Sequence, residues 1–267
     1  MYKEFYGFRD KPFSKTPDPR YLYLSRGHRE ALARLKYVLE EKEFAVLTGE
    51  IGCGKTTISR ALMDTMGDSY RFCFVLNPRL TALEFLRTVA RSLCSDLPAT
   101  SKEDLLQEMT DALYRFHCEG ISPVLVIDEA QMIPDREVYD EIRLLTNFQL
   151  DDRNLLSVVL MGQPELRTIL AAPQYEPFRQ RIAITYHLKP LTLEETQEYL
   201  DFRMEVAGGF PGLFTPDAVQ QIFELSGGVP RMINLVATNA LLEGFGREQS
   251  LIDAELVESL RGEMIHS

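Results

Sequence analysis

The sequence predicts an α/β fold, a parallel sheet flanked by helices, with a small all-helical domain after it. Between residues 44 and 188, short apolar runs alternate with amphipathic helical patterns, as in a doubly wound sheet. After Pro190 the strand-like runs stop and only helical patterns remain. We therefore expect an α/β domain at 28–190, a helical domain at 191–267, and an aromatic, proline-rich segment at 1–27 that packs on the core.

Five segments have the short apolar pattern of strands. One of them, PVLVI, is apolar without interruption, which indicates a strand covered on both faces. The predicted strands are 44–48, 71–76, 123–127, 155–161 and 182–188. The predicted helices are 28–43, one that starts near residue 55, 81–93, 102–118, 137–148, 192–207, 216–225, 231–245 and 253–261. Thr192 and Glu195 form a capping box at the first helix after Pro190, and prolines at positions 12, 17 and 19 exclude a continuous helix near the N-terminus.

Composition indicates an ordinary globular protein. Of the 267 residues, 45% are hydrophobic and 26% are charged, so the chain can bury a sizeable core. The net charge of −11 disfavours binding of nucleic acid by the whole surface, but it is compatible with a local basic patch. The four cysteines lack the short spacing of a zinc site, and the sequence has neither a signal peptide nor a long apolar run. We expect a cytoplasmic protein without a transmembrane segment.

The strongest motif is GEIGCGKTT at residues 49–57, which follows a predicted strand and opens a predicted helix. That context marks a P-loop, in which backbone N–H groups at a helix N-terminus surround phosphate oxygens. In such a loop Lys55 reaches the β- and γ-phosphates, and the hydroxyl of Thr56 binds Mg²⁺. We expect ATP to be bound by the whole motif, Gly49, Glu50, Ile51, Gly52, Cys53, Gly54, Lys55, Thr56 and Thr57.

The second motif is VLVIDEA at residues 124–130, about seventy residues after the P-loop. Its apolar strand delivers Asp128 to the carboxyl end of the sheet, where ligands of open α/β sheets bind. Asp128 is expected to hold Mg²⁺, directly or through water. Glu129 is suited to orient and polarise the water that attacks the γ-phosphate, so the pair favours ATP hydrolysis.

Four further polar side chains are candidates, each with a plainer alternative. Gln163 follows the fourth strand and could sense the γ-phosphate, or it is only a turn residue before a proline. Arg179 and Arg181 precede the fifth strand and could supply an arginine finger to a neighbouring subunit, or they line a solvated face. Arg231 begins a helix of the second domain and could reach the nucleotide from a lid, or it is a solvent-exposed arginine.

Together, the P-loop, the DEA strand, the GQPEL turn, the QRI arginine and GVPR resemble the AAA+ superfamily of P-loop NTPases. The opening FYGFRDKPFSKTPDPRYLYLS, followed by HREAL, is similar to the N-terminal signature of the ExeA (GspA) group of bacterial secretion ATPases. This resemblance implies that Gln163 is sensor 1, Arg231 is sensor 2, and Arg181 is the arginine finger with Arg179 as the second choice. It also implies nucleotide-dependent rings or filaments with active sites between subunits. Longer members of the group continue into a transmembrane segment and a peptidoglycan-binding domain, whereas this sequence ends at Ser267.

Three functions remain open at this stage. The first is an assembly ATPase that serves a secretion, pilus or polysaccharide machine through a protein partner, peripheral to the inner membrane. The second is a DNA-binding transposition regulator, since the ATPase module is also similar to the TnsC/TniB type. That function needs a basic strip, to which Arg79, Arg87 and Arg91 could contribute. The third is a nucleotide-gated switch with little turnover, and Glu129 argues against it.

Overall fold

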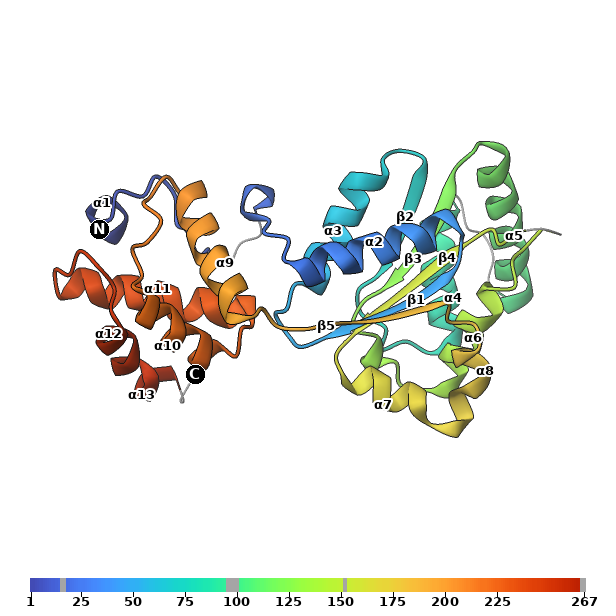
Figure 1. Ribbon diagram of the computed structural model, residues 1–267. Coiled ribbons are helices and arrows are strands. Elements are labelled where there is room, and N and C mark those ends of the chain that lie inside the picture. Colours follow the sequence, from blue (N-terminus) through green and yellow to red (C-terminus); the bar gives the residue numbers. More distant parts are fainter. Residues whose placement is uncertain (15–17, 95–100, 151–152, 265–267) are drawn as a thin grey trace. The chain divides into compact units, whose positions relative to one another are not determined.

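The computed structural model describes residues 1–14, 18–94, 101–150 and 153–264. The chain forms two compact units. The α/β unit contains His28–Gly49 and Lys55–Leu188. The helical unit contains Met1–Gly27, Lys189–Ser267 and the short segment Glu50–Gly54, which lies inside the predicted P-loop. Figure 1 shows the elements of each unit.

The α/β unit is built on one five-stranded sheet. Its strands are β1 (Phe44–Gly49), β2 (Tyr70–Val75), β3 (Ser122–Ile127), β4 (Ser157–Gly162) and β5 (Ile184–Leu188), in the order β2-β3-β4-β1-β5. All neighbouring strands are parallel. The carboxyl ends of the strands therefore lie at one edge of the sheet, and the predicted fold class is confirmed.

Helices cover both faces of this sheet. Every residue of β1 is buried, as expected for a central strand between two helical layers. On one face, Leu125 and Ile127 join a large apolar cluster with α4 (Ala82–Leu93), α5 (Lys102–Cys118) and α6 (Arg136–Leu145). The alternating Val124 and Val126 are buried on the opposite face. There α2 (Arg26–Glu40) and α3 (Lys55–Met66) pass over the sheet (Figure 1).

Two short helices of the α/β unit were not predicted. They are α7 (Glu165–Ala171) and α8 (Glu176–Arg179), and they are joined by a 3₁₀ turn at Pro173–Tyr175. Prolines inside this stretch keep each helix to one or two turns, so the stretch has no sustained helical periodicity. The two helices lead the chain from β4 to β5.

The helical unit contains α9 (Leu193–Val206), α10 (Pro216–Ser226), α11 (Pro230–Gly246), α12 (Ala254–Ser259) and α13 (Arg261–Met264). The capping box at α9 is present, because the backbone N–H of Glu195 donates to the hydroxyl of Thr192 and the Glu195 carboxylate accepts from the N–H of Thr192. Within the described ranges, no helix combines the length and the apolar composition that crossing a membrane requires.

The N-terminal segment packs on the helical unit, which corrects the prediction that it packs on the α/β core. It forms a short helix, α1 (Tyr2–Phe5), and a 3₁₀ turn at Pro19–Tyr21. Tyr2, Phe8, Phe13 and Tyr21 are buried in the same apolar cluster as the faces of α9–α12. Aromatic composition indicated that the segment is buried, but composition does not identify the surface that buries it.

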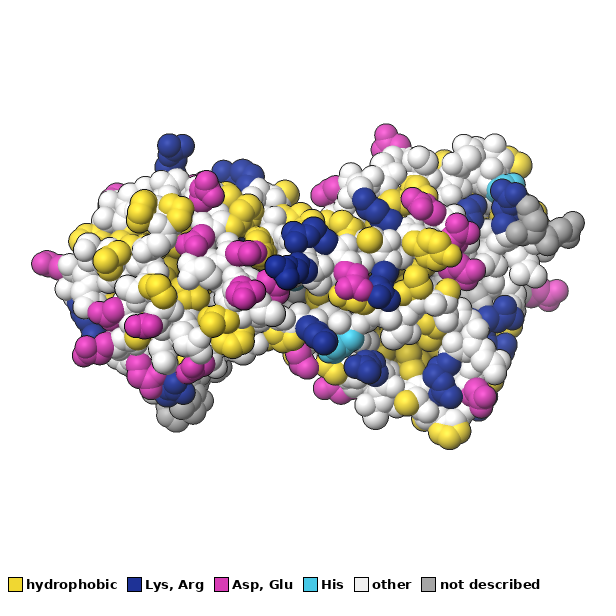
Figure 2. All heavy atoms as spheres, in the orientation of Figure 1, with side chains coloured by type: hydrophobic (Ala, Val, Ile, Leu, Met, Phe, Trp, Pro, Cys, Tyr) yellow, Lys and Arg dark blue, Asp and Glu magenta, His cyan; other side chains and the backbone are white. Residues whose placement is uncertain are grey.

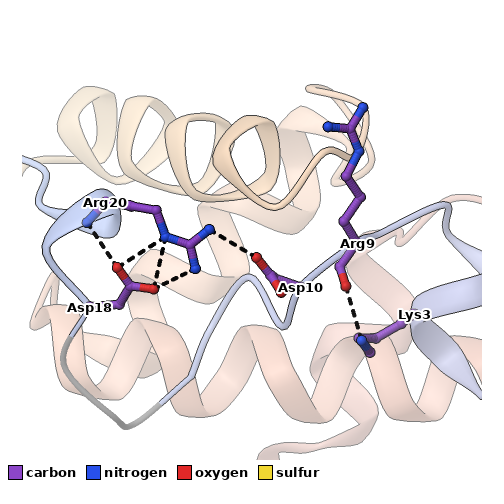
Figure 3. A network of polar contacts seen from close by, with 5 residues as sticks. All are labelled: Lys3, Arg9, Asp10, Asp18 and Arg20. Atoms are coloured by element: carbon purple, nitrogen blue, oxygen red, sulfur yellow. Dashed lines mark hydrogen bonds and ion pairs between the residues drawn. The ribbon is translucent and has the colours of Figure 1, made fainter.

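Polar contacts connect residues within this segment (Figure 3). The guanidinium of Arg20 donates to Asp18 at 2.7 Å and to Asp10 at 3.2 Å, and the ammonium of Lys3 donates to the carbonyl of Arg9 at 3.0 Å. Hydrogen bonds from Arg20 hold the pKa of Asp18 below its usual value. Because the Arg20 side chain is 63% exposed, we expect these ion pairs to add little stability.

Candidate nucleotide site

Three predicted site residues stand where neighbouring strands end. Gly49 is the last residue of β1, Asp128 follows β3, and Gln163 follows β4. Strand β4 pairs with both β1 and β3, so the sheet places its end between the other two. This edge, at the carboxyl ends of the strands, is where open α/β sheets bind ligands.

The P-loop segment has the backbone shape that its glycines permit. Gly52 and Gly54 adopt φ angles of 86° and 102°, which residues with a side chain rarely adopt. A Cβ on Gly52 would stand 2.5 Å from the Cβ of Arg231, so the close approach also requires glycine. Within the helical unit, the backbone N–H of Arg231 donates to the carbonyl of Gly52 at 3.3 Å. The predicted sensor 2 arginine therefore lies directly beside a P-loop glycine.

The remaining P-loop residues differ in exposure. Cys53 is buried and its N–H donates to the carbonyl of Glu50 at 3.2 Å, which closes a turn. The exposed members are Glu50, Ile51, Thr56 and Thr57. Because its side chain is small and buried, Cys53 fills space inside the fold.

Lys55 is the first residue of α3 and is 7% exposed. Its ammonium donates to the carbonyl of Gly49, the last residue of β1, at 2.7 Å. A buried ammonium is costly unless polar groups or an anion face it. Its place at the N-terminus of a helix fits a phosphate.

Thr56 and Asp128 bring two oxygen atoms together at the start of α3. The hydroxyl of Thr56 lies 3.4 Å from Oδ2 of Asp128. Burial raises the pKa of Asp128, against a lowering by the backbone N–H of Glu129, which donates to Oδ1 at 2.8 Å. Within the described residues, no group of three or more His, Cys, Asp and Glu side chains could hold a metal by itself. Mg²⁺ at nucleotide sites needs only one or two protein oxygens besides phosphate and water, so this pair fits it.

Glu129 has an unusual backbone conformation and two amide partners. Its φ of 50° and ψ of 38° are left-handed, a conformation that is uncommon for a residue other than glycine and is often found at functional sites. Its Oε2 accepts a hydrogen bond from Nε2 of Gln163 at 3.0 Å and another from Nε2 of Gln131 at 2.5 Å. The structure therefore brings the predicted water-orienting carboxylate and the predicted sensor 1 into direct contact.

Gln131 is the residue of this site that the sequence analysis missed. Besides its bond to Glu129, its Oε1 accepts from the backbone N–H of Gln163 at 3.0 Å. A Cβ on Gly162 would stand 2.9 Å from that Oε1, so the glycine before Gln163 leaves room for the amide. The sequence signal was the polar residue directly after DEA, in a turn too short to have a periodic pattern.

The two arginines before β5 have different surroundings. Nη1 of Arg179 donates to the carbonyls of Leu170 and Ala172 at 2.5 and 2.9 Å, so this side chain holds the end of α7. Arg181 is exposed, and its backbone N–H donates to the carbonyl of Phe178 at 3.1 Å in the turn that follows α8. The first arginine therefore makes a structural contact, whereas the second presents its side chain at the surface.

Arg181 lies near the amino ends of the strands, whereas Lys55 lies near their carboxyl ends. It lines a pocket with Lys42, Glu43, Phe44, Thr146, Asn154 and Leu156. Phe44 begins β1, and the strand's six residues separate it from the P-loop by roughly 17 Å. The structure therefore does not bring Arg181 to the phosphate-binding edge of its own chain.

Comparisons with known proteins agree with this fold. Residues 38–170 match the family model described as AAA domain. The structure is similar to Cdc6p from Pyrobaculum aerophilum, with a TM-score of 0.68, 19% identity and coverage of 91% of this chain and 68% of that one. It is also similar to the Aeropyrum pernix ORC2 protein, with a TM-score of 0.67, 19% identity and coverage of 96% and 72%. The parallel sheet, the P-loop motif and these matches define the fold of an AAA+ P-loop NTPase.

In sequence, the chain is similar to General secretion pathway protein A of Aeromonas hydrophila. The two are 41% identical over 254 residues. The match covers 92% of this chain and 45% of the relative, so the chain spans about half of that protein's length. The expected resemblance to this group is confirmed.

Proposed function

We propose that the chain binds ATP with Mg²⁺ and hydrolyses it. The observation that carries this proposal is the grouping, at one edge of the sheet, of Lys55, the Thr56–Asp128 oxygens and Glu129. Lys55 and the P-loop N–H groups bind the phosphates, and Thr56 and Asp128 hold Mg²⁺. The metal would neutralise charge on the phosphate oxygens.

In the proposed reaction, Glu129 orients a water molecule toward the γ-phosphorus. The water oxygen forms a bond to phosphorus while the bond to the β–γ bridging oxygen breaks, which yields ADP and inorganic phosphate. The proton of the water passes to the Glu129 carboxylate and then to solvent. Gln163 is proposed to detect the γ-phosphate with its amide, and its hydrogen bond to Glu129 supports this role.

ATP turnover of the Glu129→Gln variant tests this mechanism. Turnover should fall by roughly 10²-fold or more, the usual loss for a general base, while ATP affinity is kept. Glu137→Gln is the matched control, because Glu137 is an exposed carboxylate at the start of α6. If the wild type binds ATP and never hydrolyses it, the proposal fails and the switch function replaces it.

We further propose that the active enzyme is an oligomer, a ring or a filament. The exposed position of Arg181 at the amino edge of the sheet supports this, because its guanidinium can serve only a nucleotide held by another copy. The helical unit is proposed to act as a lid, with Arg231 as sensor 2. Turnover per chain that rises with protein concentration, and is lost in Arg181→Met, would support a shared active site.

The pathway that we propose is a secretion-type machine at the inner membrane, with a protein partner. The similarity to General secretion pathway protein A supports it. In residues 189–267 of the helical unit, acidic residues outnumber basic ones, and Figure 2 shows acidic side chains spread over the visible face of this unit. Such a surface repels nucleic acid and suits a partner with basic patches.

A DNA-binding regulator is the second candidate, because α4 and the loop before it present basic residues. Arg79 and Arg91 are exposed and Arg87 is half-buried. Duplex DNA binding that weakens steeply between low and moderate salt, and is lost in an Arg79→Ala, Arg91→Ala double variant, would establish this function. ATP turnover that does not change when DNA is added would favour the secretion-type assembly ATPase.

A further inference from the structure

Gln131 connects the carboxylate of Glu129 to the end of β4. Its side-chain amide makes two hydrogen bonds in opposite senses, because Nε2 donates to Glu129 and Oε1 accepts from the backbone N–H of Gln163. The side chain of a glutamine has this capacity, since it carries both donors and an acceptor. Neither bond can be replaced by an apolar residue of the same length.

The turn that carries Gln131 is anchored to the core of the α/β unit. It is the 3₁₀ turn Ala130–Met132, and Ala130 is completely buried. The hydroxyl of Tyr139, on α6, donates to the carbonyl of Ala130 at 3.1 Å, and the Tyr139 side chain is 1% exposed. Because the turn is anchored in the core, Gln131 can hold a neighbour in place.

The two oxygens of Glu129 have different surroundings. Oε2 accepts both amide hydrogen bonds, whereas no described residue donates to Oε1. A carboxylate held through one oxygen has the other available for water. A γ-phosphate sensor must also direct its amide toward phosphate. When Gln163 does so, its hydrogen bond to Glu129 is weakened or broken.

We propose that Gln131 is a positioning residue that keeps Glu129 in its water-orienting conformation, including when Gln163 turns toward phosphate. Gln131 touches neither nucleotide nor water in this role and acts through Glu129. The inference rests on the proposed hydrolysis. It adds that the Glu129 carboxylate is tied to the backbone of the γ-phosphate sensor through one amide.

Steady-state kinetics of Gln131→Leu test the inference. The change removes both bonds with an apolar side chain of comparable size, so kcat should fall by about 10- to 100-fold, the value of one hydrogen bond to a charged group, with KM within about twofold of wild type. Gln107→Leu is the control, because it removes an exposed amide–carboxylate bond to Asp111 on α5. An unchanged kcat in Gln131→Leu, or a fall in kcat together with a large rise in KM, would overturn the inference.

Gln131→Glu tests the bond to Glu129 separately from the bond to Gln163. It keeps the acceptor for Gln163 but puts a second carboxylate against Glu129. Two like charges in contact repel each other, so the Glu129 carboxylate should leave its position and kcat should fall about as far as in Gln131→Leu, although the bond to Gln163 is kept. A wild-type kcat in Gln131→Glu contradicts the inference.

Amide hydrogen exchange separates this inference from the proposed hydrolysis, because it needs no turnover. The Gln163 N–H should exchange at least tenfold faster in Gln131→Leu than in wild type, and Gln131→Glu should retain protection. Equal protection in all three proteins would overturn the connection even in an active enzyme. A wild type that shows the exchange pattern without any hydrolysis would instead refute the proposed function.

Discussion

The hydroxyl of Thr56 lies 3.4 Å from Oδ2 of Asp128, although 72 positions separate the two residues in the chain. Thr56 reaches this point from the first turn of α3, and Asp128 from the end of β3. The fold thus holds two oxygen atoms from two elements close together. Preorganisation of this kind lowers the cost of binding a metal ion.

We predict that Asp128→Asn removes most of the Mg²⁺ dependence of ATP binding. The amide keeps the shape of the side chain but loses the charge that Mg²⁺ prefers among its ligands. ATP affinity measured with Mg²⁺ should fall by about tenfold or more, whereas affinity measured in EDTA should stay within about twofold of wild type. Asp135→Asn, at the exposed start of α6, should change neither value.

The same variant should be at least as stable as wild type at neutral pH without Mg²⁺. Burial raises the pKa of Asp128 in the folded chain. The stability linked to its proton is present below the ordinary aspartate pKa and is lost as the pH rises through the raised value. Asparagine has no such loss, so its melting temperature relative to wild type should rise between acidic and neutral pH. A relative melting temperature that falls over this range would contradict the assigned burial effect.

Arg179 and Arg181 should give opposite results. Arg179→Met removes two charged hydrogen bonds to backbone carbonyls, so unfolding free energy in urea should drop by about 1.5–3 kcal/mol. Arg181→Met should stay within about 0.5 kcal/mol of wild type, because the side chain is exposed. Its ATP turnover should fall roughly 10³-fold, as for the loss of an arginine finger.

Mixing two inactive variants tests whether Arg181 acts in a neighbouring copy. Lys55→Ala copies keep Arg181 but bind phosphate poorly, and Arg181→Met copies keep an intact P-loop. Equal mixtures should recover measurable turnover, since an Arg181 side chain from one copy can meet the nucleotide of the other. Mixtures as inactive as the separate proteins would place Arg181 outside the reaction.

The sequence predicted those parts of the fold and site that depend on local patterns. The helix at Lys102–Cys118 matches its predicted bounds, and the P-loop and the Asp128–Glu129 pair lie at the ends of strands as expected. Tertiary surroundings were not predictable in the same way. Arg179 and Arg181 are two positions apart, and only the fold shows that the first caps α7. The contact of Gln131 is with Gln163, thirty-two positions away, after the end of β4.

Arg203 should stabilise the helical unit much more than Arg20 does. The Arg203 side chain is buried, with its guanidinium 4.9 Å from the ring centre of Tyr21 and its Nε donating to the carbonyl of Pro12 at 2.7 Å. Arg203→Met should lower the unfolding free energy by about 2–3 kcal/mol, measured in urea. Arg20→Met, which removes exposed ion pairs and a longer contact of 5.7 Å with the ring centre of Tyr21, should cost about 1 kcal/mol or less. Equal losses would show that the buried guanidinium does not hold the N-terminal segment.

Gly162→Ala should impair turnover through Gln131. The new methyl group would stand 2.9 Å from Oε1 of Gln131 and 2.8 Å from Cδ2 of the buried Leu166, so one of these side chains must move. Since Leu166 is packed in the core, the displacement falls mainly on the amide, and kcat should drop by about tenfold with a stability loss of about 1–3 kcal/mol. Gly246→Ala is the control, because a methyl group there meets nothing within 4 Å. Wild-type turnover in Gly162→Ala, with the Gln163 amide still protected from exchange, would contradict this prediction. It would show that Leu166 moves instead and that the Gln131 contact does not require glycine at position 162.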